Sequence, residues 1–383
     1  MNSNFFGKKL GIIGGGQLGK MLIAECNKMN ITTFVLDSSE NSPCKNICSQ
    51  FYLGDINDYE TVLNFGKKCD IITFEIEHIN LDSLIELEKL GKNVYPKSNT
   101  LKIIKDKNQQ KIFFKKNNVP TANFKYFKNL KELKKSLEKN EIKFPCIWKK
   151  TKFGYDGYGV KILKSIDDVK SLPESEMIIE DFIAFEKELS VIVARKADGE
   201  VKSYKTVEME FNKESNQVEY VISPAQISYK IEKKARDLAI KLSNSLDCVG
   251  LIAVEMFLIN NELLVNELAP RPHNSGHFSI EACQTSQFQQ HIRAIFNLKL
   301  GNTDHSGFAI MLNLVGGMNH NGKVYYENLE NVFKCKSANL HIYGKEETRP
   351  NRKMGHITII CDKFEDGYEN AKFLKKSIKV KTV

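Results

Sequence analysis

Short apolar runs alternate with amphipathic segments along the first hundred residues. KLGIIG, TTFVLD, IITFEIE and NVYP have the length of buried strands, whereas LGKMLIAECNKM and LDSLIELEKLG repeat their apolar positions with the period of a helix. Strands and helices that alternate in this way are typical of βαβ units on a parallel sheet. We therefore expect an α/β domain over residues 1–100.

The pattern changes near Thr100. A lysine-rich helix is predicted over LKIIKDKNQQKIFFKKNN and ends before Pro120, and short strands with a glycine-rich loop follow to about residue 225. Residues 228–246 have helical periodicity, and LIAVEMFLINNELLVNEL alternates as a β-hairpin that turns at Asn260 and Asn261. This mixture predicts an α+β domain over residues 101–300.

The last segment, residues 301–383, contains the apolar runs FAIMLNLVG, NLHIYG and GHITII. These runs predict short strands, and we expect no helix long enough to stand alone. No repeat or low-complexity linker divides the chain, and its 383 residues suffice for two or three packed domains. We expect a small C-terminal β-rich domain that packs closely against the others.

Composition narrows the class of protein. No apolar run approaches the roughly 20 residues that a membrane span needs. Nine cysteines are scattered without CxxC or Cys/His ligand spacing, as expected for reduced thiols in the cytoplasm. The formal charge of +9 comes mostly from dispersed lysines without interleaved aromatics, which argues against nucleic acid and fits an attraction for phosphorylated small molecules.

A first glycine-rich motif, GGGQLG at residues 14–19, links the first predicted strand to the first helix. It matches GxGxxG, and Asp37 closes the next strand about 20 residues later, which is the pattern of a dinucleotide-binding loop. The physics of the motif is more general, because glycines let any ligand approach and a helix N-terminus favours any anion. A nicotinamide enzyme, a site for another ligand and a structural tight turn stay open on this motif alone.

A second glycine-rich loop, GYDGYG at residues 154–159, follows a predicted strand that ends in Lys149. A lysine on a rigid strand beside such a loop suits nucleotide phosphates, because the loop can fold over them and exclude water. No Gly-Lys-Ser/Thr follows, so the loop is not a P-loop. An exposed hairpin is the alternative.

Two acids and an amide, Glu255, Glu267 and Asn266, lie among the apolar residues of the predicted hairpin. If the loop has three residues centred on Asn261, the two acids lie opposite each other on one face, whereas a two-residue loop would separate them. Paired carboxylates repel unless a cation lies between them, and hard oxygen ligands suit Mg²⁺ that bridges nucleotide phosphates. A solvated hairpin face is the alternative.

The run APRPHNSGH at residues 269–277 is too polar and too rich in proline for a core strand or helix. Arg271, His273 and Asn274 supply donors suited to a small planar anion such as bicarbonate. His273 and His277 have the spacing of a metal pair on a helix, but the prolines and glycine argue against that helix, so zinc is not expected.

Three cations, Lys345, Arg352 and Lys353, lie near one another across a predicted loop that contains Pro350. Such a group suits a phosphate monoester on a substrate. A solvated charged loop is the alternative.

Taken in order, these motifs resemble those of the N5-carboxyaminoimidazole ribonucleotide synthetases, ATP-grasp enzymes of microbial purine synthesis. The similarity extends from about Lys9 to about Ile359 and rests on GIIGGGQLG, TFEIEHI, GYDGYG, ELSVIVAR, NELAPRPHNSGHFSIEACQTSQFQQHIRAI, and YGK with RKMGH. The resemblance implies an ATP-grasp fold with an N-terminal Rossmann-like domain, usually a homodimer, in which the second glycine loop acts as a lid over ATP. It reassigns the first glycine loop from NAD to the ribonucleotide substrate.

The resemblance also implies a role for each matching residue. The residues implied in ATP binding are Lys107, Lys149, Gly154, Tyr155, Asp156, Gly157, Tyr158, Gly159, Val160, Glu180, Asp181, Phe182, Ile183, Glu188, Phe211, Asn266 and Glu267. Those implied in binding aminoimidazole ribonucleotide are Gln17, Leu18, Glu75, Tyr155, Asp156, Lys345, Arg352 and Lys353. Those implied in catalysis are Arg271, His273, Asn274 and Lys353, and the implied ligands of two Mg²⁺ ions are Glu255 and Glu267.

The implied reaction is the carboxylation of 5-aminoimidazole ribonucleotide by bicarbonate and ATP, with release of ADP and phosphate. The chain departs from the family pattern at Phe211, where a histidine is common, at Lys107, where arginine is usual, and at Phe153, Tyr158 and Val160 of the lid. A formate-dependent glycinamide ribonucleotide transformylase of the same fold and a non-catalytic nucleotide-binding homologue are the alternatives.

Overall fold

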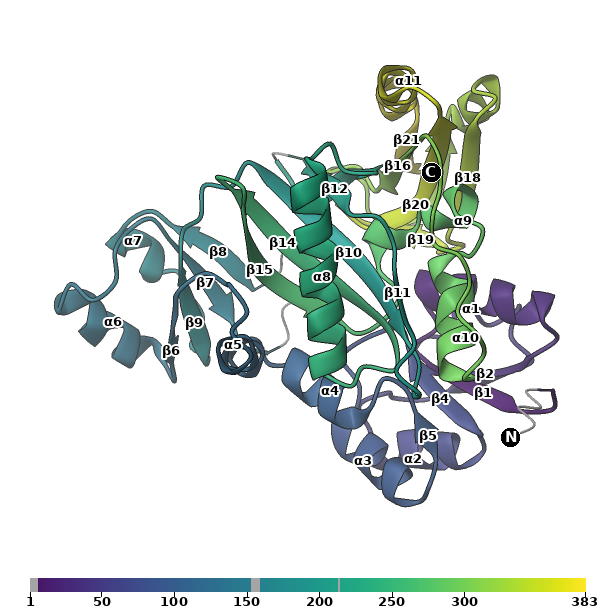
Figure 1. Cartoon of the computed structure of the whole chain (residues 1–383), viewed down its shortest axis with the longest axis horizontal. Helices are drawn as coiled ribbons and strands as arrows, with labels where there is room; N and C mark the ends of the chain where they lie inside the picture. Colours follow the sequence, from purple (N-terminus) through teal and green to yellow (C-terminus); the bar gives the residue numbers. More distant parts are fainter. Residues whose placement is uncertain (1–5, 153–158, 213) are drawn as a thin grey trace.

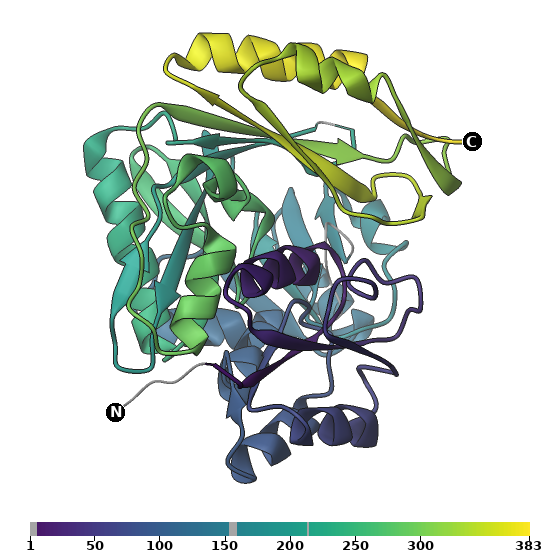
Figure 2. The same ribbon diagram turned by 90° about the vertical axis from the view of Figure 1, so that its right-hand side faces the viewer.

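A parallel sheet organises the N-terminal part of the computed structural model, which describes residues 6–152, 159–212 and 214–383 (Figure 1). Its strand order, β3-β2-β1-β4-β5, is that of doubly wound α/β domains. The elements are β1 (Lys9–Ile13), α1 (Gln17–Lys28), β2 (Thr32–Asp37), β3 (Gln50–Leu53), α2 (Tyr59–Lys67), β4 (Ile71–Phe74), α3 (Leu81–Lys89) and β5 (Asn93–Val94). Helix α1 packs on one face and α2 with α3 on the other, as the alternating pattern predicted (Figure 2).

Two short helices then connect this domain to the rest of the chain, α4 (Ser98–Ile104) and α5 (Lys107–Lys116). The expectation of one continuous helix is wrong, because Asp106 starts a new one. Its carboxylate accepts the backbone N–H groups of Asn108 at 2.9 Å and Gln109 at 3.1 Å, which is the N-cap arrangement that satisfies the first turn of α5.

A small antiparallel sheet forms the lobe at the left of Figure 1, with the strand order β6-β9-β7-β8. Its elements are β6 (Phe124–Phe127), α6 (Leu130–Glu138), β7 (Cys146–Lys150), β8 (Val160–Leu163), α7 (Ile166–Val169) and β9 (Met177–Asp181). One core, which includes Phe127, Leu133, Trp148 and Leu163, joins α6 to the sheet.

The largest sheet is antiparallel, with the strand order β15-β14-β10-β12-β13-β16-β20-β18, and β11 pairs with β10. Its strands are β10 (Lys187–Arg195), β11 (Val201–Ser203), β12 (Val207–Phe211), β13 (Val218–Ser223), β14 (Gly250–Ile259), β15 (Glu262–Ala269), β16 (Phe308–Val315), β18 (Ala338–Ile342) and β20 (Lys353–Cys361). Helix α8 (Tyr229–Ser245) covers one face of β10 and α10 (Gln287–Ile295) lies on the other side. The predicted helix and hairpin are both confirmed.

The C-terminal strands β16, β20 and β18 extend this same sheet. The remaining elements are η1 (Asn274–Gly276), α9 (Ser279–Ala282), β17 (Gly322–Glu327), η2 (Leu329–Lys334), β19 (Glu347–Thr348), α11 (Phe364–Ser377) and β21 (Lys379–Thr382). The expectation that no long helix follows residue 301 is wrong, because α11 packs on β16 and β20. Its fully buried positions are only Gly367, Ala371 and Leu374, a face too narrow to stand out in the hydrophobic pattern.

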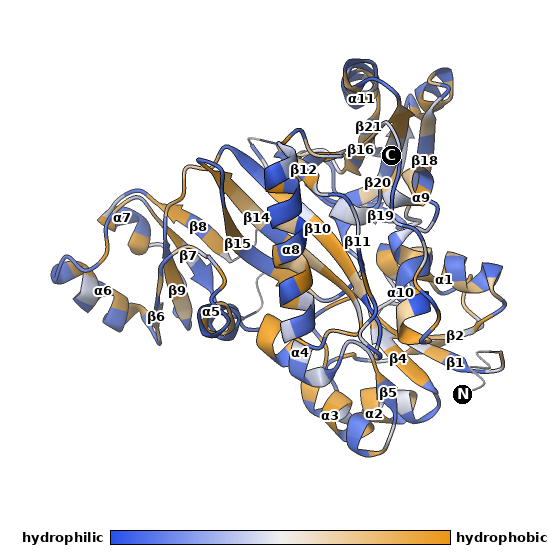
Figure 3. Ribbon diagram, in the orientation of Figure 1, coloured by the Kyte–Doolittle hydropathy of each residue, from blue (hydrophilic) through white to orange (hydrophobic). Residues whose placement is uncertain are grey.

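Apolar residues concentrate in the central strands (Figure 3), and apolar residues of the helices pack against them. All nine cysteines are free thiols, and six of them are buried. Among the described residues, no helix is both long enough and apolar enough to span a membrane.

Candidate active site

The β14–β15 hairpin brings the two predicted acids together. Its turn has two residues, Asn260 and Asn261, at φ of 48° and 64°, a left-handed conformation that asparagine tolerates better than most residues. Of the two loop lengths that the sequence left open, the hairpin has the two-residue loop. A β-bulge restores the expected result, because Met256 pairs with Val265 while Glu255 pairs with Glu267.

Because of the bulge, Asn266 has no residue opposite it on β14. The carboxylates of Glu255 and Glu267 therefore lie on the same face of the sheet. Glu188 of β10 lies close enough to both acids to interact with their charges. Burial and the charge of Glu267 raise the pKa of Glu188 to about 8. Burial, with Glu267 and Glu188, also raises the pKa of Glu255 well above its usual value, whereas the charge of Lys107 lowers the pKa of Glu267 to about 2. The three acids therefore form a site that a cation would stabilise.

Three lysines, Asn266 and Glu180 form a largely buried polar cluster next to these acids. Lys107 forms an ion pair with Glu267, and the Nζ of Lys149 donates to the Oδ1 of Asn266 at 2.8 Å. Lys149 and Lys111 each approach the carboxylate of Glu180 at 2.9 Å. These lysines line a small pocket with Asn266 and Glu267, so the cluster presents ammonium groups where a polyphosphate could bind.

Lys111 is a residue that the sequence reasoning missed. It is buried, it donates to the Oγ1 of Thr121 at 2.6 Å, and burial lowers its pKa to about 8. A signal was present in the sequence, because residues four apart on a helix share a face and Lys111 follows Lys107 by four positions.

The segment predicted to bind adenine, residues 180–183, comprises the end of strand β9 and the two residues after it. Glu180 is buried by its two lysine partners, whereas Asp181 and Phe182 are exposed and Ile183 is half-buried. The Nδ2 of Asn123 donates to Asp181 at 2.9 Å.

Three other residues predicted to bind ATP lie in the described part of the chain, namely Phe211, Gly159 and Val160. Phe211, at the end of β12, packs partly buried against the core between β10 and β16. Gly159 has a φ of 79°, and Val160 begins β8. Five predicted lid residues lie outside the described residues, as does Phe153; the five are Gly154, Tyr155, Asp156, Gly157 and Tyr158.

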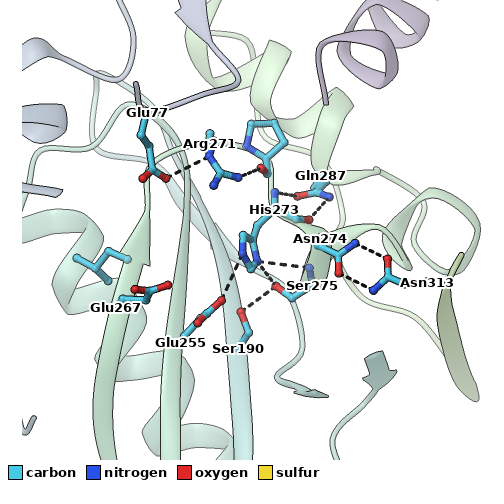
Figure 4. Close-up of polar contacts among 12 residues, drawn as sticks. Glu77, Ser190, Glu255, Glu267, Arg271, His273, Asn274, Ser275, Gln287 and Asn313 are labelled. Carbon is cyan, nitrogen blue, oxygen red and sulfur yellow. Dashed lines mark hydrogen bonds and ion pairs between the residues drawn. The ribbon is translucent and has the colours of Figure 1, made fainter. Parts of the chain in front are cut away.

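The predicted bicarbonate residues Arg271, His273 and Asn274 follow β15, and their side chains point in different directions (Figure 4). The Nε of Arg271 lies 3.1 Å from Glu77, and the Nε2 of His273 lies 3.3 Å from Glu255. Ser275 is 2.8 Å from the Nδ1 of His273. The structure thus brings His273 to the acid pair, whereas Arg271 forms an ion pair with Glu77.

Glu77, the partner of Arg271, was not predicted. It lies two residues after Glu75 beyond the end of β4, so the alternation in TFEIEHI was the available signal. The amide of Asn274 exchanges two hydrogen bonds of 2.9 Å with the amide of Asn313, so Asn274 is held by β16 rather than directed at the acids.

Two carboxylates of the protein accept hydrogen bonds from the backbone of the first glycine loop. Glu75 accepts the N–H groups of Gly16 at 2.6 Å, Leu18 at 3.2 Å and Gly19 at 3.3 Å, at the N-terminus of α1. Asp37 accepts the N–H of Gly15 at 2.6 Å. Asp37, the acid that a dinucleotide-binding loop would direct to a ribose, therefore has a structural partner here.

The distal cations lie beside the same glycine loop. The Nζ of Lys20 in α1 donates to the carbonyl of Ile342 at 3.0 Å, which joins the helix that carries Gln17 and Leu18 to the segment before Lys345. Lys345 donates to the carbonyl of Lys353 at 2.7 Å, and Arg352 donates to the carbonyl of Glu347 at 2.7 Å. Helix α1, which carries Gln17 and Leu18, therefore contacts the end of β18, three residues before Lys345.

The acids meet the requirements of magnesium better than those of zinc. Within the parts of the chain that the structure describes, no three His, Cys, Asp or Glu side chains form a metal-binding group on their own. Mg²⁺ bound to nucleotides commonly takes one or two carboxylates and completes its shell with phosphate oxygens and water. Glu255 and Glu267 match that donor set, and the raised pKa values of Glu255 and Glu188 indicate uncompensated negative charge.

Comparison with known protein families divides the chain into three matches. Residues 7–105 match the ribonucleotide synthetase preATP-grasp domain, residues 112–288 match the ATP-grasp domain, and residues 309–369 match the phosphoribosylaminoimidazole carboxylase C-terminal domain. The ATP-grasp fold with a preATP-grasp domain, expected from the motifs, is confirmed.

Individual relatives agree with these matches. The N5-carboxyaminoimidazole ribonucleotide synthase of Bacillus subtilis is 39% identical over 361 residues, which cover 92% of each protein. The crystal structure of the synthetase from Thermotoga maritima is 41% identical, covers 98% of this chain and 100% of its own, and has a TM-score of 0.89. The synthase of Aspergillus clavatus in complex with ADP and 5-aminoimidazole ribonucleotide is 31% identical, with coverage of 97% and 98% and a TM-score of 0.88. The chain therefore belongs to the N5-carboxyaminoimidazole ribonucleotide synthase family of ATP-grasp ligases.

Proposed function

We propose that this protein uses ATP and bicarbonate to carboxylate 5-aminoimidazole ribonucleotide to N5-carboxyaminoimidazole ribonucleotide, with release of ADP and phosphate, in purine biosynthesis. One observation carries the proposal. The acid pair Glu255 and Glu267, with Lys107 and Lys149 on one side, has the Arg271–His273 segment on the other. A phosphate-binding cluster and an anion-binding segment thus share one pair of carboxylates.

ATP is assigned to the space between the small antiparallel sheet and the large one. Lys107 and Lys149 would hold its phosphates, the end of β9 would hold adenine, and Glu188 would hold the ribose. The proposal extends to the lid residues 154–158, which the sequence motif alone supports. Relatives crystallised with ADP or ATP support nucleotide binding in this fold.

Magnesium is assigned to Glu255 and Glu267, as two Mg²⁺ ions. When bound, magnesium would neutralise negative charge on the β- and γ-phosphates. The raised pKa of Glu255 supports this assignment, because a divalent cation would relieve the repulsion between Glu255 and Glu267.

Chemistry at the site then proceeds in two stages. An oxygen of bicarbonate attacks the γ-phosphorus of ATP, and the bond from that phosphorus to the bridging oxygen breaks, which gives carboxyphosphate and ADP. Arg271 and His273 orient the anion, and Lys149 offsets charge on the transferring group. Carboxyphosphate then divides into CO₂ and phosphate, and the exocyclic amine attacks the carbon of CO₂ inside a site closed to water while it loses one proton.

The ribonucleotide is assigned to the meeting point of the two chain ends. Gln17, Leu18 and Glu75 would contact its base and sugar, and Lys345 with Arg352 and Lys353 would bind its phosphate. The hydrogen bond from Lys20 to the carbonyl of Ile342 supports the assignment, because it joins helix α1 to the end of the strand that precedes Lys345.

The roles of the domains, the cellular location and the oligomeric state complete the proposal. Residues 1–100 would bind the ribonucleotide, residues 101–300 would bind ATP, and residues 301–383 would supply the phosphate-binding cations. We place the protein in the cytoplasm, since nine free thiols suit a reducing compartment. We also propose a homodimer, which sedimentation equilibrium would test.

Substrate exchange tests the proposed reaction against its nearest rival. The purified protein is supplied with ATP and either bicarbonate or formate, and with either aminoimidazole ribonucleotide or glycinamide ribonucleotide. We expect ADP only with bicarbonate, at full rate only with aminoimidazole ribonucleotide. Turnover with formate and glycinamide ribonucleotide would identify a transformylase, and ATP binding without ADP under every condition would identify a non-catalytic homologue.

A further inference from the structure

The side-chain amide of Gln287, the first residue of α10, forms two hydrogen bonds with the backbone of His273 (Figure 4). The N–H of His273 donates to the Oε1 of Gln287 at 3.0 Å, and the Nε2 of Gln287 donates to the carbonyl of His273 at 2.8 Å. A backbone N–H can donate only to the oxygen of a side-chain amide, and a backbone carbonyl can accept only from its nitrogen. These two contacts therefore fix which end of the fully buried Gln287 amide is which.

The same amide determines the protonation of a second histidine. The Nε2 of Gln287 lies 3.0 Å from the Nδ1 of His277. Because the amide nitrogen is only a donor, Nδ1 of His277 must be the acceptor, so a neutral His277 carries its proton on Nε2. A proton on Nδ1 would place two N–H groups against each other.

The surroundings of His277 also disfavour its charged form. Burial lowers its pKa well below the usual value, and the positive charges of His273, Lys353, His341 and Arg271 act in the same direction. Phe288 lies against the ring, with centroids 5.7 Å apart.

His277 is one end of a stack of three histidine rings. The centroids of His277 and His356 are 4.8 Å apart, and those of His356 and His341 are 4.4 Å apart with the rings only 9° from parallel. Glu281 pairs with the Nε2 of His341 at 2.6 Å, and the hydroxyl of Tyr343 lies 3.0 Å from the Nδ1 of His356. The Nε2 of His356 is buried without a partner among the described residues, so a charge on this middle ring would lack compensation.

The stack joins two parts of the site. His277 directly follows the η1 turn and lies four residues after His273, whereas His356 lies on β20, which begins at Lys353. Contact between the two rings therefore ties the segment proposed to orient bicarbonate to the strand proposed to bind the ribonucleotide phosphate.

We propose that Gln287 is a positioning residue that orients His273 and keeps His277 neutral with its proton on Nε2, so that the His277–His356 stack fixes His273 relative to Lys353. This inference rests on the proposed function for the roles of His273 and Lys353. The protonation state of His277 is independent of those roles.

The test compares Gln287→Glu with a matched variant, Gln290→Glu. Gln290 is also fully buried in α10, and its amide makes the same paired contact, with the carbonyl of Gly301 at 3.1 Å and its N–H at 2.9 Å, but it touches no residue of the site. A glutamate at 287 can accept from His273 but cannot donate to its carbonyl, and its charge would draw a proton onto the Nδ1 of His277.

We expect Gln287→Glu to lower kcat on the order of 10- to 100-fold, because small displacements of orienting groups cost that much, while KM for ATP stays unchanged. The ring ¹⁵N resonances of His277 should change from the neutral Nε2–H form to the doubly protonated form. Gln290→Glu should keep kcat and these resonances. Equal losses of kcat in both variants, with unchanged His277 resonances, would overturn the proposal.

The wild-type spectrum is a test even if Gln287→Glu does not fold. His277 protonated on Nδ1 in the wild-type protein would refute the inference. If instead the wild-type protein forms no ADP from bicarbonate, the proposed function fails, and the ¹⁵N result still decides the state of His277.

A second pair of variants tests the stack. His356→Ala removes the middle ring, so we expect KM for aminoimidazole ribonucleotide to rise on the order of 10-fold with KM for ATP unchanged. His356→Phe retains a ring and should restore most of the affinity. Equal KM values in the two variants would show that stacking does not position Lys353.

Discussion

At the scale of single residues, three neighbouring acids dominate the electrostatics of the site, of which Glu188 is buried and the other two are partly buried. Glu188, Glu255 and Glu267 interact, and Lys107 compensates mainly Glu267. Moving a carboxylate out of water disfavours its charged form unless a cation compensates. The ligand-free protein should therefore hold a proton on this group of acids near neutral pH.

Glu188 allows a direct test of that imbalance. Its pKa of about 8 exceeds the value of about 4.3 in an unfolded chain, so between these values the folded protein binds more protons and its stability falls as pH rises. A glutamine cannot ionise, so the variant Glu188→Gln should not lose stability as pH rises through this range. We expect its free energy of unfolding to exceed that of the wild type by roughly 2 to 5 kcal/mol at pH 8 and by little at pH 4. Urea denaturation of the ligand-free proteins measures the difference.

The exposed Glu186, two residues earlier, provides the control, because Glu186→Gln should follow the wild-type curve at every pH. A constant difference between Glu188→Gln and wild type from pH 4 to 8 would contradict the raised pKa.

Magnesium binding depends on Glu267 in this account. We expect Glu267→Gln to lower kcat on the order of 100-fold or more and to raise the Mg²⁺ concentration for half-maximal rate, because a metal ligand is lost. Glu262→Gln, at the exposed start of the same strand, serves as control and should retain activity. Undiminished turnover in Glu267→Gln would refute the magnesium assignment.

Among the secondary-structure elements, the β14–β15 hairpin has the largest effect on the site. A shift of one residue moves a strand side chain to the opposite face. The two-residue turn alone would place Glu255 and Glu267 on opposite faces, and the bulge at Asn266 reverses this.

Deleting Asn266 should therefore abolish ADP formation, because Glu267 would point to the other side of the sheet. Asn266→Ala keeps the bulge and loses only the hydrogen bond from Lys149, so we expect a loss of roughly 10- to 100-fold. Steady-state ADP release compares the two. If the deletion were as active as Asn266→Ala, the bulge would not orient Glu267.

Helix α5 carries Lys107 and Lys111, and Asp106 caps it. Asp106→Ala should cost about 1 kcal/mol of stability and raise KM for ATP about fivefold, because the first turn of the helix holds Lys107. Asn129→Ala removes the equivalent cap of α6, whose residues lie away from the site. It should cost similar stability in thermal unfolding and leave KM for ATP unchanged; an equal rise in both variants would contradict the role of α5.

In the whole molecule, the site is assembled from segments far apart in the chain. Glu77 of the N-terminal domain binds Arg271, Asn313 of β16 holds Asn274, and Lys353 begins β20. Folding of all three parts is therefore required before the anion-binding segment has its final form.

Local patterns predicted the elements better than the contacts between them. The alternation of residues 8–100, the helix of α8 and the hairpin were correct because each depends on neighbours in sequence. The pairing of Asn274 with Asn313, 39 residues apart, and of Arg271 with Glu77, 194 residues apart, left no local signal. Helix α11 was missed because small residues, Gly367 and Ala371, make much of its buried face.

The residue types of the site were predicted from their chemistry, but their partners were not. Paired acids and clustered cations indicated phosphate and metal binding without showing that Glu75 would bind the N-terminus of α1. Roles in catalysis came from the resemblance of ordered motifs, because spacing alone left NAD and other ligands open.

The central claim is that ATP cleavage is coupled to bicarbonate and the ribonucleotide amine. Its most direct test is the rate of ADP release by the purified protein with bicarbonate and aminoimidazole ribonucleotide each present or omitted. We expect rapid ADP release only when both are present, slow release without aminoimidazole ribonucleotide and none without bicarbonate. Rapid ADP release without bicarbonate would contradict the central claim.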